Sequence, residues 1–286
     1  MRIIWAFCLF LPIAGMSQQR LHITAYGGLM NYQGDLQEKN FTLDQARFSA
    51  GFGLQYDLTE RIAVRAGFAF GKVQGNDKLN KDPFLKARNL SFQSHVNEGH
   101  LLLQYTFFDL NDKKISPYVF GGVALYHFNP YAYDTSGNKL YLKPLSTEGQ
   151  GLPQYPSRKD YKLTQFAVPF GVGVKFRVSD NVVLGYEIGL RKLFNDYLDD
   201  VSTRYIDPNV LFQERGQKAV EMSYRGGELK DGVTTYPDFN IKRGGPARDW
   251  YYTNGITLTI GLNTGNGSSY GGGRYRNNQM GCPKVN

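Results

Sequence analysis

An alternation of apolar residues with small or polar ones, sustained over membrane-spanning lengths, most constrains the fold of this chain. The clearest example is the segment 165–178. One face carries Phe166, Val168, Phe170, Val172, Val174, Phe176 and Val178. The other carries Gln165, Ala167, Pro169, Gly171, Gly173, Lys175 and Arg177. A period of two residues predicts a β-strand with two different faces. Because the second face is small and sparsely charged, it suits the interior of a narrow barrel whose outside is apolar.

Eight segments of this kind can be drawn along the chain. They are His22–Gln33, Arg47–Asp57, Arg61–Gln74, Arg88–Asp109, Ser116–Phe128, Tyr161–Ser179, Val182–Asp196 and Trp250–Leu262. Eight is an allowed strand number for a transmembrane β-barrel. The mean hydropathy of −0.41 is compatible with such a barrel, since only alternate residues of each strand need be apolar.

The connections between these segments alternate in length. Short turns rich in Asp, Asn and Ser follow the even segments, at 57–60, 111–114 and 179–181. Long loops follow the odd segments, at 34–46, 76–87, 129–160 and 197–249. Short periplasmic turns and long external loops are typical of outer-membrane barrels. We therefore expect an all-β fold over residues 18–262: an eight-stranded antiparallel up-and-down transmembrane β-barrel in the cell outer membrane.

The first residues are typical of a secretory signal peptide. Arg2 supplies the positive charge, Ile3–Ala14 the apolar stretch, and Gly15-Met16-Ser17 the small residues before a cleavage site. This predicts a signal peptide over residues 1–17. The apolar stretch is shorter than the roughly 20 residues that a spanning helix needs, so a membrane span is expected to be β.

The segment 263–286 is expected to be a flexible, Gly-rich, basic tail in the periplasm. Arg274 and Arg276 contribute to its positive charge, and such tails can bind a partner by folding on it. Cys282 is the single cysteine that remains once the signal peptide is removed, so no internal disulfide is expected. An inert thiol is the simpler interpretation of Cys282, and an intermolecular bridge is the alternative.

Five charged residues fall on the small-residue faces of their strands and are expected to point into the barrel. They are Arg65, Lys175, Arg177, Glu187 and Arg191. Buried charges need partners, so we expect a lumenal network in which Glu187 pairs with Arg65 or Lys175. Because side chains can fill an eight-stranded barrel, this network predicts a plug, with a selective pore as the alternative.

The sequence gives little support to catalysis. The four histidines do not stand in the spacing of a catalytic triad or a metal site. His95 with Ser91 or Ser94 is the remaining candidate, for a lipid hydrolase at the barrel rim. We expect a non-enzymatic protein with no cofactor, no nucleic-acid partner and no small-molecule substrate.

Four carboxylates crowd the last long loop and raise the question of a calcium site. They are Asp196, Asp199, Asp200 and Asp207. They lack the spacing of a calcium-binding loop. We expect instead a solvated acidic loop, or one that pairs with Arg191 and Arg204.

Aromatic residues near the strand ends are candidates for the girdles that such barrels place at the membrane interfaces. The candidates are Tyr56, Phe70, Phe107, Phe108, Tyr118, Tyr126, Phe128, Phe176, Trp250 and Tyr252. Core packing of a soluble β-sandwich is the alternative explanation for these aromatic residues.

Three stretches carry a family resemblance. The first is Tyr26-Gly27-Gly28 with the following Asn31–Leu36, and the second is Leu142–Leu152, which contains Glu148. The third and most specific is Asp196–Ser202, with Asp196, Tyr197, Asp199 and Asp200, continued by Thr203-Arg204-Tyr205. Together with Asp249–Tyr252, they resemble the PorG-like family of outer-membrane barrels, which is associated with the type IX secretion system of Bacteroidota. The resemblance covers nearly the whole mature chain.

The resemblance implies a small barrel that helps to tie the periplasmic ring of that secretion machine to the outer membrane. Its partners would be outer-membrane lipid and periplasmic or outer-membrane secretion components. The second and third stretches lie in long loops, where they would stabilise the barrel rim or touch another outer-membrane component. The tail is the candidate contact for a periplasmic partner.

Two further interpretations stay open. One is a surface-binding, adhesin-like outer-membrane barrel that uses the loops 129–160 and 197–249 to hold an external ligand. The other is a soluble, lipocalin-like periplasmic barrel with its apolar faces turned inward, because alternation alone does not tell the two faces apart.

Overall fold

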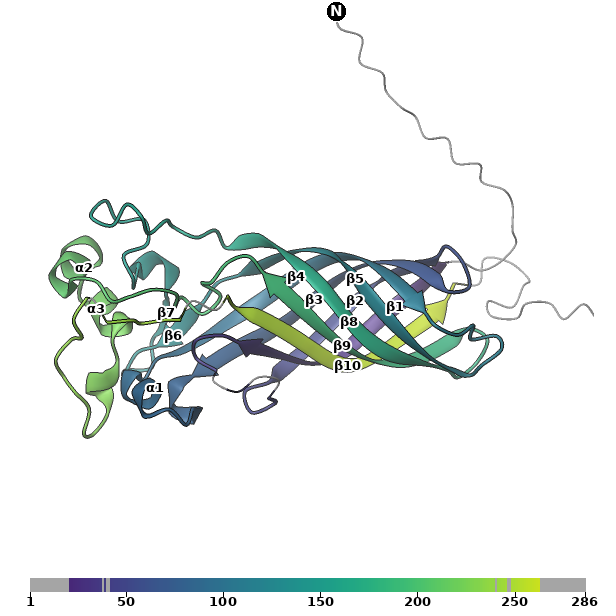
Figure 1. Cartoon of the computed structure of the whole chain (residues 1–286), viewed down its shortest axis with the longest axis horizontal. Helices are drawn as coiled ribbons and strands as arrows, with labels where there is room; N and C mark the ends of the chain where they lie inside the picture. The colour runs from purple at the N-terminus through teal and green to yellow at the C-terminus, as the bar shows by residue number, and fades with distance from the viewer. Residues whose placement is uncertain (1–20, 38, 40–41, 240, 246–247, 263–286) are drawn as a thin grey trace, which may run out of the picture.

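Figure 1 shows a closed β-barrel with the long connections gathered at one end. The computed structural model describes residues 21–262 except 38, 40–41, 240 and 246–247. The expected signal peptide and the expected tail, with Arg274, Arg276 and Cys282, therefore lie outside the described residues. Among the described residues, no helix combines the length and apolar character needed to cross a membrane.

Eight long strands form the barrel wall. They are β1 (Leu21–Gln33), β2 (Arg47–Asp57), β3 (Ile62–Asn76), β4 (Ser91–Thr106), β5 (Ile115–Phe128), β8 (Thr164–Arg177), β9 (Val182–Leu193) and β10 (Trp250–Gly261). Neighbours pair antiparallel in the order β3-β2-β1-β10-β9-β8-β5-β4, and β3 also pairs with β4, which closes the sheet. The expected eight-stranded antiparallel barrel is confirmed, with strand ends within three residues of those drawn from the sequence.

Alternate residues of the strands point outward, and most of them are apolar. On β8, the exposed fraction is 65% for Phe166 and 54% for Val172. Ala167 and Lys175, on the opposite face of the same strand, are buried inside the barrel. The faces therefore have the orientation expected for an apolar exterior, which excludes the inverted, lipocalin-like arrangement.

Several aromatic residues expected at the outer surface instead point inward. Tyr118, Tyr126 and Phe128 lie on the inward face of β5 and are buried. Tyr252 lies on the outward face of β10, in register with the exposed Ile256, but the first long loop covers it, and its hydroxyl donates a hydrogen bond to the carbonyl of Thr42 at 2.5 Å. The expectation of an outward side chain was wrong for the three residues of β5 because that strand is apolar on both faces, so aromatic character does not reveal the outward face. The other candidates with large exposed fractions are Tyr56, Phe70, Phe107, Phe108 and Phe176.

The four long loops pack together into a cap over one end of the barrel (Figure 1). We define the cap as the described residues of 34–46, 77–90, 129–163 and 194–249. Its regular elements are η1 (Asp77–Leu79), α1 (Pro83–Arg88), β6 (Tyr131–Tyr133), β7 (Lys139–Tyr141), η2 (Lys143–Leu145), α2 (Pro208–Arg215), α3 (Gln217–Ser223) and η3 (Gly226–Glu228). The three short turns lie at the other end, as the alternation of loop lengths predicts.

Two Asp-Pro pairs start two of the three α-helices of the cap. Asp82 and Asp207 stand at the N-caps of α1 and α2, each followed by a proline at the first helical position. The side chain of Asp207 accepts a hydrogen bond from the backbone N–H of Asn209 at 2.8 Å. This is ordinary helix capping, and it accounts for Asp207 without a metal ion.

Two glycines of β8 make room for aromatic rings inside the barrel. Gly173 pairs with Tyr118 across the sheet, and Gly171 pairs with Phe120. A Cβ atom on Gly173 would lie 2.5 Å from the Tyr118 ring, and one on Gly171 would lie 2.5 Å from the Phe120 ring. Aromatic rings laid over glycines stabilise curved sheets, and here they also fill the lumen.

Gly173→Ala is expected to lower the free energy of unfolding by about 1–3 kcal/mol, because the added methyl group displaces the Tyr118 ring in a filled interior. The measurement is a urea unfolding curve of the refolded barrel. Gly99→Ala is the matched control, since a Cβ at Gly99 meets no atom within 4 Å. Equal midpoints for the two variants would contradict this account of the glycine face.

Candidate functional site

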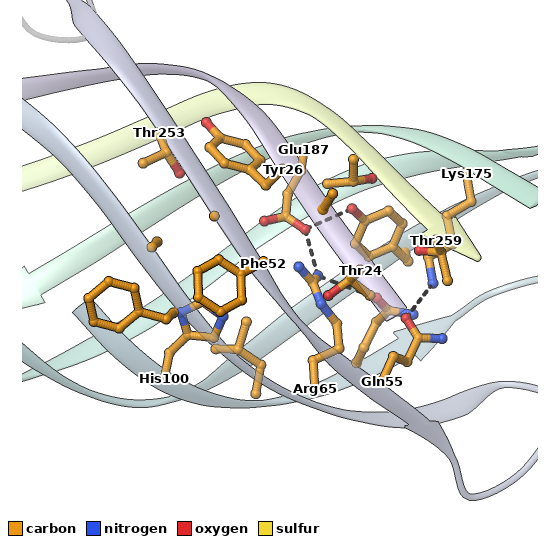
Figure 2. Close-up of a pocket in the computed structure, with 18 of the residues that line it drawn as sticks. Thr24, Tyr26, Phe52, Gln55, Arg65, His100, Lys175, Glu187, Thr253 and Thr259 are labelled. Atoms are coloured by element: carbon orange, nitrogen blue, oxygen red, sulfur yellow. Dashed lines mark hydrogen bonds and ion pairs between the residues drawn. The ribbon is translucent and has the colours of Figure 1, made fainter. Parts of the chain in front are cut away.

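The first charged cluster lies inside the barrel and joins β3, β5 and β9. Arg65 Nη1 lies 2.6 Å from Glu187 Oε2, and the hydroxyl of Tyr118 donates to the same oxygen at 2.8 Å. The Arg65 and Glu187 side chains are only 11% and 6% exposed. Figure 2 shows Arg65 and Glu187 extending from opposite walls toward one another. The pair spans the lumen and neutralises both charges where water is largely excluded.

A second ion pair lies closer to the cap. Glu98 on β4 accepts hydrogen bonds from Arg191 Nε at 3.0 Å and Nη2 at 3.2 Å, and from the Tyr251 hydroxyl at 2.5 Å. His100 Nδ1 lies 3.0 Å from Glu98 Oε1, which also accepts from Arg191 Nη2, and Thr253 accepts from Arg191 Nη1 at 2.7 Å. Glu98 is therefore saturated with partners, as a buried charge must be. Sequence reasoning did not single out Glu98, although it shares the inward register of β4 with the buried Gln104.

Lys175 and Arg177, the other two charges expected in the lumen, hydrogen-bond to side-chain amides. Lys175 is buried and donates to Gln55 Oε1 at 3.4 Å, with its ammonium group 5.2 Å from the centre of the Tyr118 ring. It does not pair directly with Glu187, which leaves Arg65 as the partner of that carboxylate. Arg177 lies at the turn end of β8, where its guanidinium donates to Asn111 at 3.4 Å. The structure therefore brings Arg65, Lys175, Glu187 and Arg191 together in the lumen and places Arg177 at the turn end of the same face, next to Asn111.

Little free space remains between these side chains. The lumenal cavity has a volume of about 40 Å³ and is lined by the Arg65, Lys175, Glu187 and Arg191 side chains, together with threonines of β10 (Figure 2). Such a volume holds a few water molecules. The paired side chains reach from one wall of the barrel to the other, and in the described part of the chain they leave no wide aqueous path through the lumen.

A third cluster of buried charges holds the cap together. Glu148 Oε1 lies 3.1 Å from Arg243 Nη1, and both side chains are almost fully buried. The Glu148 carboxylate also accepts hydrogen bonds from the backbone N–H groups of Ser202 and Thr203 at 3.1 and 2.9 Å. Arg243 donates to the carbonyl of Asp200 at 2.7 Å. These bonds join the third long loop to two parts of the fourth.

The acidic residues of the most specific family stretch lie in this cluster. The Asp200 carboxylate accepts from Thr147 Oγ1 at 2.5 Å and from the Tyr161 hydroxyl at 2.7 Å. Asp199 accepts a hydrogen bond from the Tyr32 hydroxyl of β1, and the Tyr197 ring stacks on Tyr161 with centroids 4.9 Å apart. Asp199 and Asp200 are therefore buried, and they connect the loops to one another and to the barrel. For these two residues, the expectation of a solvated loop or of pairing with Arg191 and Arg204 was wrong.

Burial controls the ionisation of these cap carboxyls. It raises the pKa of Asp200 to about 6, against the opposing influence of the Arg243 charge. It also raises the pKa of Asp196 to about 6 and that of Asp35 to about 7. The pKa of Asp199 is raised by burial and by the nearby Asp35 carboxylate. Burial therefore shifts the ionisation of four acids in one region toward the neutral form.

The first two long loops are joined to the fourth loop through another buried ion pair, which the sequence did not reveal. Arg88 Nε lies 2.7 Å from Asp77 Oδ2, and Arg88 Nη2 donates to the carbonyl of Asp35 at 2.8 Å. Arg88 Nη1 donates to the carbonyl of Arg243. All four long loops are consequently joined through buried hydrogen bonds to charged groups.

The geometry supports neither a metal site nor the candidate catalytic pair of His95 with Ser91 or Ser94 at the barrel rim. In the described part of the chain, no group of three or more His, Cys, Asp and Glu side chains is arranged to hold a metal ion. His95 is exposed on the outer face of β4, whereas Ser94 is buried on the inner face, where its hydroxyl accepts from the backbone of Asn129 at 3.0 Å. Ser91 accepts a hydrogen bond from Arg225 at 3.1 Å. These groups do not form a nucleophile and base.

A family model described as a domain of unknown function, DUF6089, matches residues 1–210. The chain belongs to the DUF6089 family. Its match covers the barrel from β1 to β9 and the three stretches quoted above, which lie in β1 with the first loop, in the third loop and in the fourth loop. No curated protein matches the sequence.

Solved structures similar to this DUF6089 chain include outer-membrane proteins at low sequence identity. Neisserial surface protein A is 9% identical with a TM-score of 0.41, covering 85% of this chain and 97% of its own. Ail of Yersinia pestis is 8% identical with a TM-score of 0.40, covering 86% and 99%. A major outer membrane protein of Thermus thermophilus is 11% identical with a TM-score of 0.40, covering 85% and 99%.

Glu98→Gln is expected to destabilise this DUF6089 barrel by about 3–5 kcal/mol, because it leaves the Arg191 guanidinium buried without a counter-charge. The measurement is the free energy of unfolding in urea. Glu221→Gln is the control: its partner Lys218 lies at 2.8 Å, but both side chains are 40% or more exposed. That exposed pair is worth at most about 1 kcal/mol. A loss below about 1 kcal/mol for Glu98→Gln would refute the importance of the lumenal pair.

The cap of this DUF6089 protein is expected to be more stable at pH 4 than at pH 7. The folded-state pKa of Asp200, about 6, lies above its ordinary value near 4. A raised pKa contributes stability that is complete below pH 4 and is lost as the pH rises through 6, here about 3 kcal/mol. Asp35 and Asp196 act in the same direction. Hydrogen exchange of the cap amides, corrected for intrinsic rates, measures this change.

Asp200→Asn should flatten the pH dependence of cap protection, because the side chain no longer titrates. Asp231→Asn, at an exposed cap position, is the matched control and should leave the slope unchanged. If cap protection depended on pH equally in Asp200→Asn and in wild type, the Asp200 carboxyl would not be the group whose raised pKa causes that dependence.

Proposed function

We propose that this protein is a non-enzymatic β-barrel of the outer membrane that serves a type IX protein secretion machine as a component or anchor. In this orientation the cap faces outside and the short turns face the periplasm. Lipid surrounds the barrel wall, and the lumen does not conduct solutes. The role combines a membrane anchor with a rigid external cap.

The apolar exterior of the barrel carries the membrane part of the proposal. From Phe166 to Val178, each outward residue of β8 and the following turn is apolar and at least 36% exposed. At about 3.3 Å per residue this stretch covers about 40 Å along the strand. At a tilt of about 40° it rises about 30 Å, which matches a hydrocarbon core. Exposed apolar surface on this scale is unfavourable in water.

The plugged lumen argues for anchoring over transport. Arg65, Glu187 and Glu98 with their partners fill the interior, and the remaining cavity of about 40 Å³ is far smaller than a channel. The Ser-His pairing needed for a rim hydrolase does not form. A barrel that neither conducts nor catalyses would act by binding other molecules at its surface.

The secretion part of the proposal is supported by the family resemblance and by where its residues lie. Glu148, Tyr197, Asp199 and Asp200 come from two loops and meet in one buried cluster. Their burial favours a structural role: they hold the cap in one shape and are not themselves partner contacts. Partner contacts would then be made by the exposed cap surface or by the segment 263–286.

Fractionation tests the membrane part. The protein should be recovered in the outer membrane, and its gel migration should differ between boiled and unboiled samples. In planar bilayers the purified barrel should give no steady conductance. A fully soluble protein with heat-independent migration would refute the membrane proposal, and stable open channels would refute the plug.

Secretion assays in the native host test the machine part. Loss of the protein should reduce export of type IX cargo, and a chain truncated after Leu262 should recover fewer periplasmic partners in a pull-down. Normal cargo export without the protein would refute a secretion role. Unchanged partner recovery would remove the segment 263–286 from it.

A surface-binding barrel is the second candidate, and the exposed apolar residues of the cap favour it. Phe212, Val233 and Phe239 are 53%, 63% and 58% exposed on the cap. Replacing all three by serine should leave cargo export intact and abolish adhesion if the cap holds an external ligand. Reduced export with unchanged adhesion would favour the secretion role.

A further inference from the structure

An open groove lies where β8 and β9 meet the cap. The segment 157–166 forms one side of it, and Phe194, Asn195 and Tyr197 form the other. Its volume is about 770 Å³, far larger than the lumenal cavity. We call this feature the rim groove. It opens on the outside of the barrel, at the level where the apolar wall ends.

The lower edge of the rim groove is apolar. Phe166 and Phe194 line it and are 65% and 54% exposed. Phe166 is the first outward residue of the apolar stretch on β8, so the two rings stand at the boundary between the hydrocarbon region and the headgroup region of a surrounding bilayer.

The upper edge is cationic and poorly neutralised. Arg158, Lys159 and Lys162 line it. The Arg158 guanidinium donates to the carbonyls of Glu148 and Arg204 at 2.5 and 2.9 Å, which orients it without cancelling its charge. Within the described residues, the ammonium groups of Lys159 and Lys162 make no hydrogen bond or ion pair.

The acidic group at the groove is compensated, and a further lysine adds to the positive charge. Asp160 lines the groove, and its carboxylate lies 2.7 Å from Lys143 Nζ. Lys192 is exposed at the outer end of β9, paired across the sheet with Val168. Its long side chain can extend along the apolar wall toward the groove while the ammonium group stays at the headgroup level.

We propose that the rim groove binds the phosphorylated disaccharide headgroup of a glycolipid of the lipid A class in the outer leaflet. Its phosphates would meet Lys159, Lys162 and Arg158, and its acyl chains would lie against Phe166 and Phe194. An apolar edge below and unpaired cations above complement an anionic amphiphile. This inference rests on the proposed outer-membrane location, and it names a ligand that the proposed function does not require.

The test compares two triple variants of the full mature chain, refolded in detergent and checked for heat-dependent migration. One variant is Lys159→Gln, Lys162→Gln, Lys192→Gln. The control is Lys78→Gln, Lys86→Gln, Lys230→Gln, which removes three exposed cap lysines that also lack ion pairs in the described part of the chain. Both variants lose the same charge. Native mass spectrometry titrates bound diphosphoryl lipid A and its dephosphorylated form.

Wild type and the control should bind diphosphoryl lipid A about tenfold or more tightly than the dephosphorylated lipid, and the groove variant should lose this preference. Inorganic phosphate at about 20 mM should not displace the lipid, because the acyl chains contribute to binding. Equal losses in both triple variants, or no phosphate preference in wild type, would overturn the inference. Displacement by inorganic phosphate would reassign the groove to a free anion. A chain that folds as a barrel but does not insert into vesicles would contradict the proposed function instead.

Discussion

Closure of the sheet between β3 and β4 is the constraint on which the rest of this structure depends. Once the eight strands form a ring, no strand edge of the wall is left unpaired, and the backbone satisfies its own hydrogen bonds. Each strand then has one face toward a narrow lumen and one toward the surroundings. The side chains alone decide which surroundings are tolerated. Val172 and its outward neighbours are compatible with lipid, whereas Glu187 and its inward neighbours require paired partners.

The narrowness of the ring explains both the plug and the cap. Opposite walls are close enough for Arg65 to reach Glu187 across the lumen at 2.6 Å, so the charges cancel and stiffen the barrel. Buried ion pairs also join the loops at the outer end, where Glu148 with Arg243 and Asp77 with Arg88 lie beside the apolar core of the cap. Buried pairs of this kind contribute more to a unique arrangement than to net stability. A cap held in one shape on the barrel fits the anchoring role proposed above.

Much of the barrel was predictable from sequence, because a period of two residues is a local signal and loop length adds a second one. The direction of the inward charges followed from the small residues around them, as for Lys175 and Glu187. The pairing of Arg191 with Glu98 was not predictable, since it joins residues 93 positions apart whose contact depends on barrel shear. Tyr118 and Tyr126 were misplaced because β5 is apolar on both faces. The burial of Asp200 was missed because loop acids are usually solvated, and only the packed cap removes this one from water.

The central claim is that the apolar face of the barrel contacts lipid, and fluorescence quenching by brominated acyl chains tests it most directly. In a Trp250→Phe background of the mature chain, Phe170→Trp places a single indole on the outward face and Phe120→Trp places one in the lumen. The account predicts strong quenching of the indole at 170 and weak quenching of the indole at 120 in vesicles of brominated lipid. Weak quenching at both positions, or stronger quenching at 120, would contradict it.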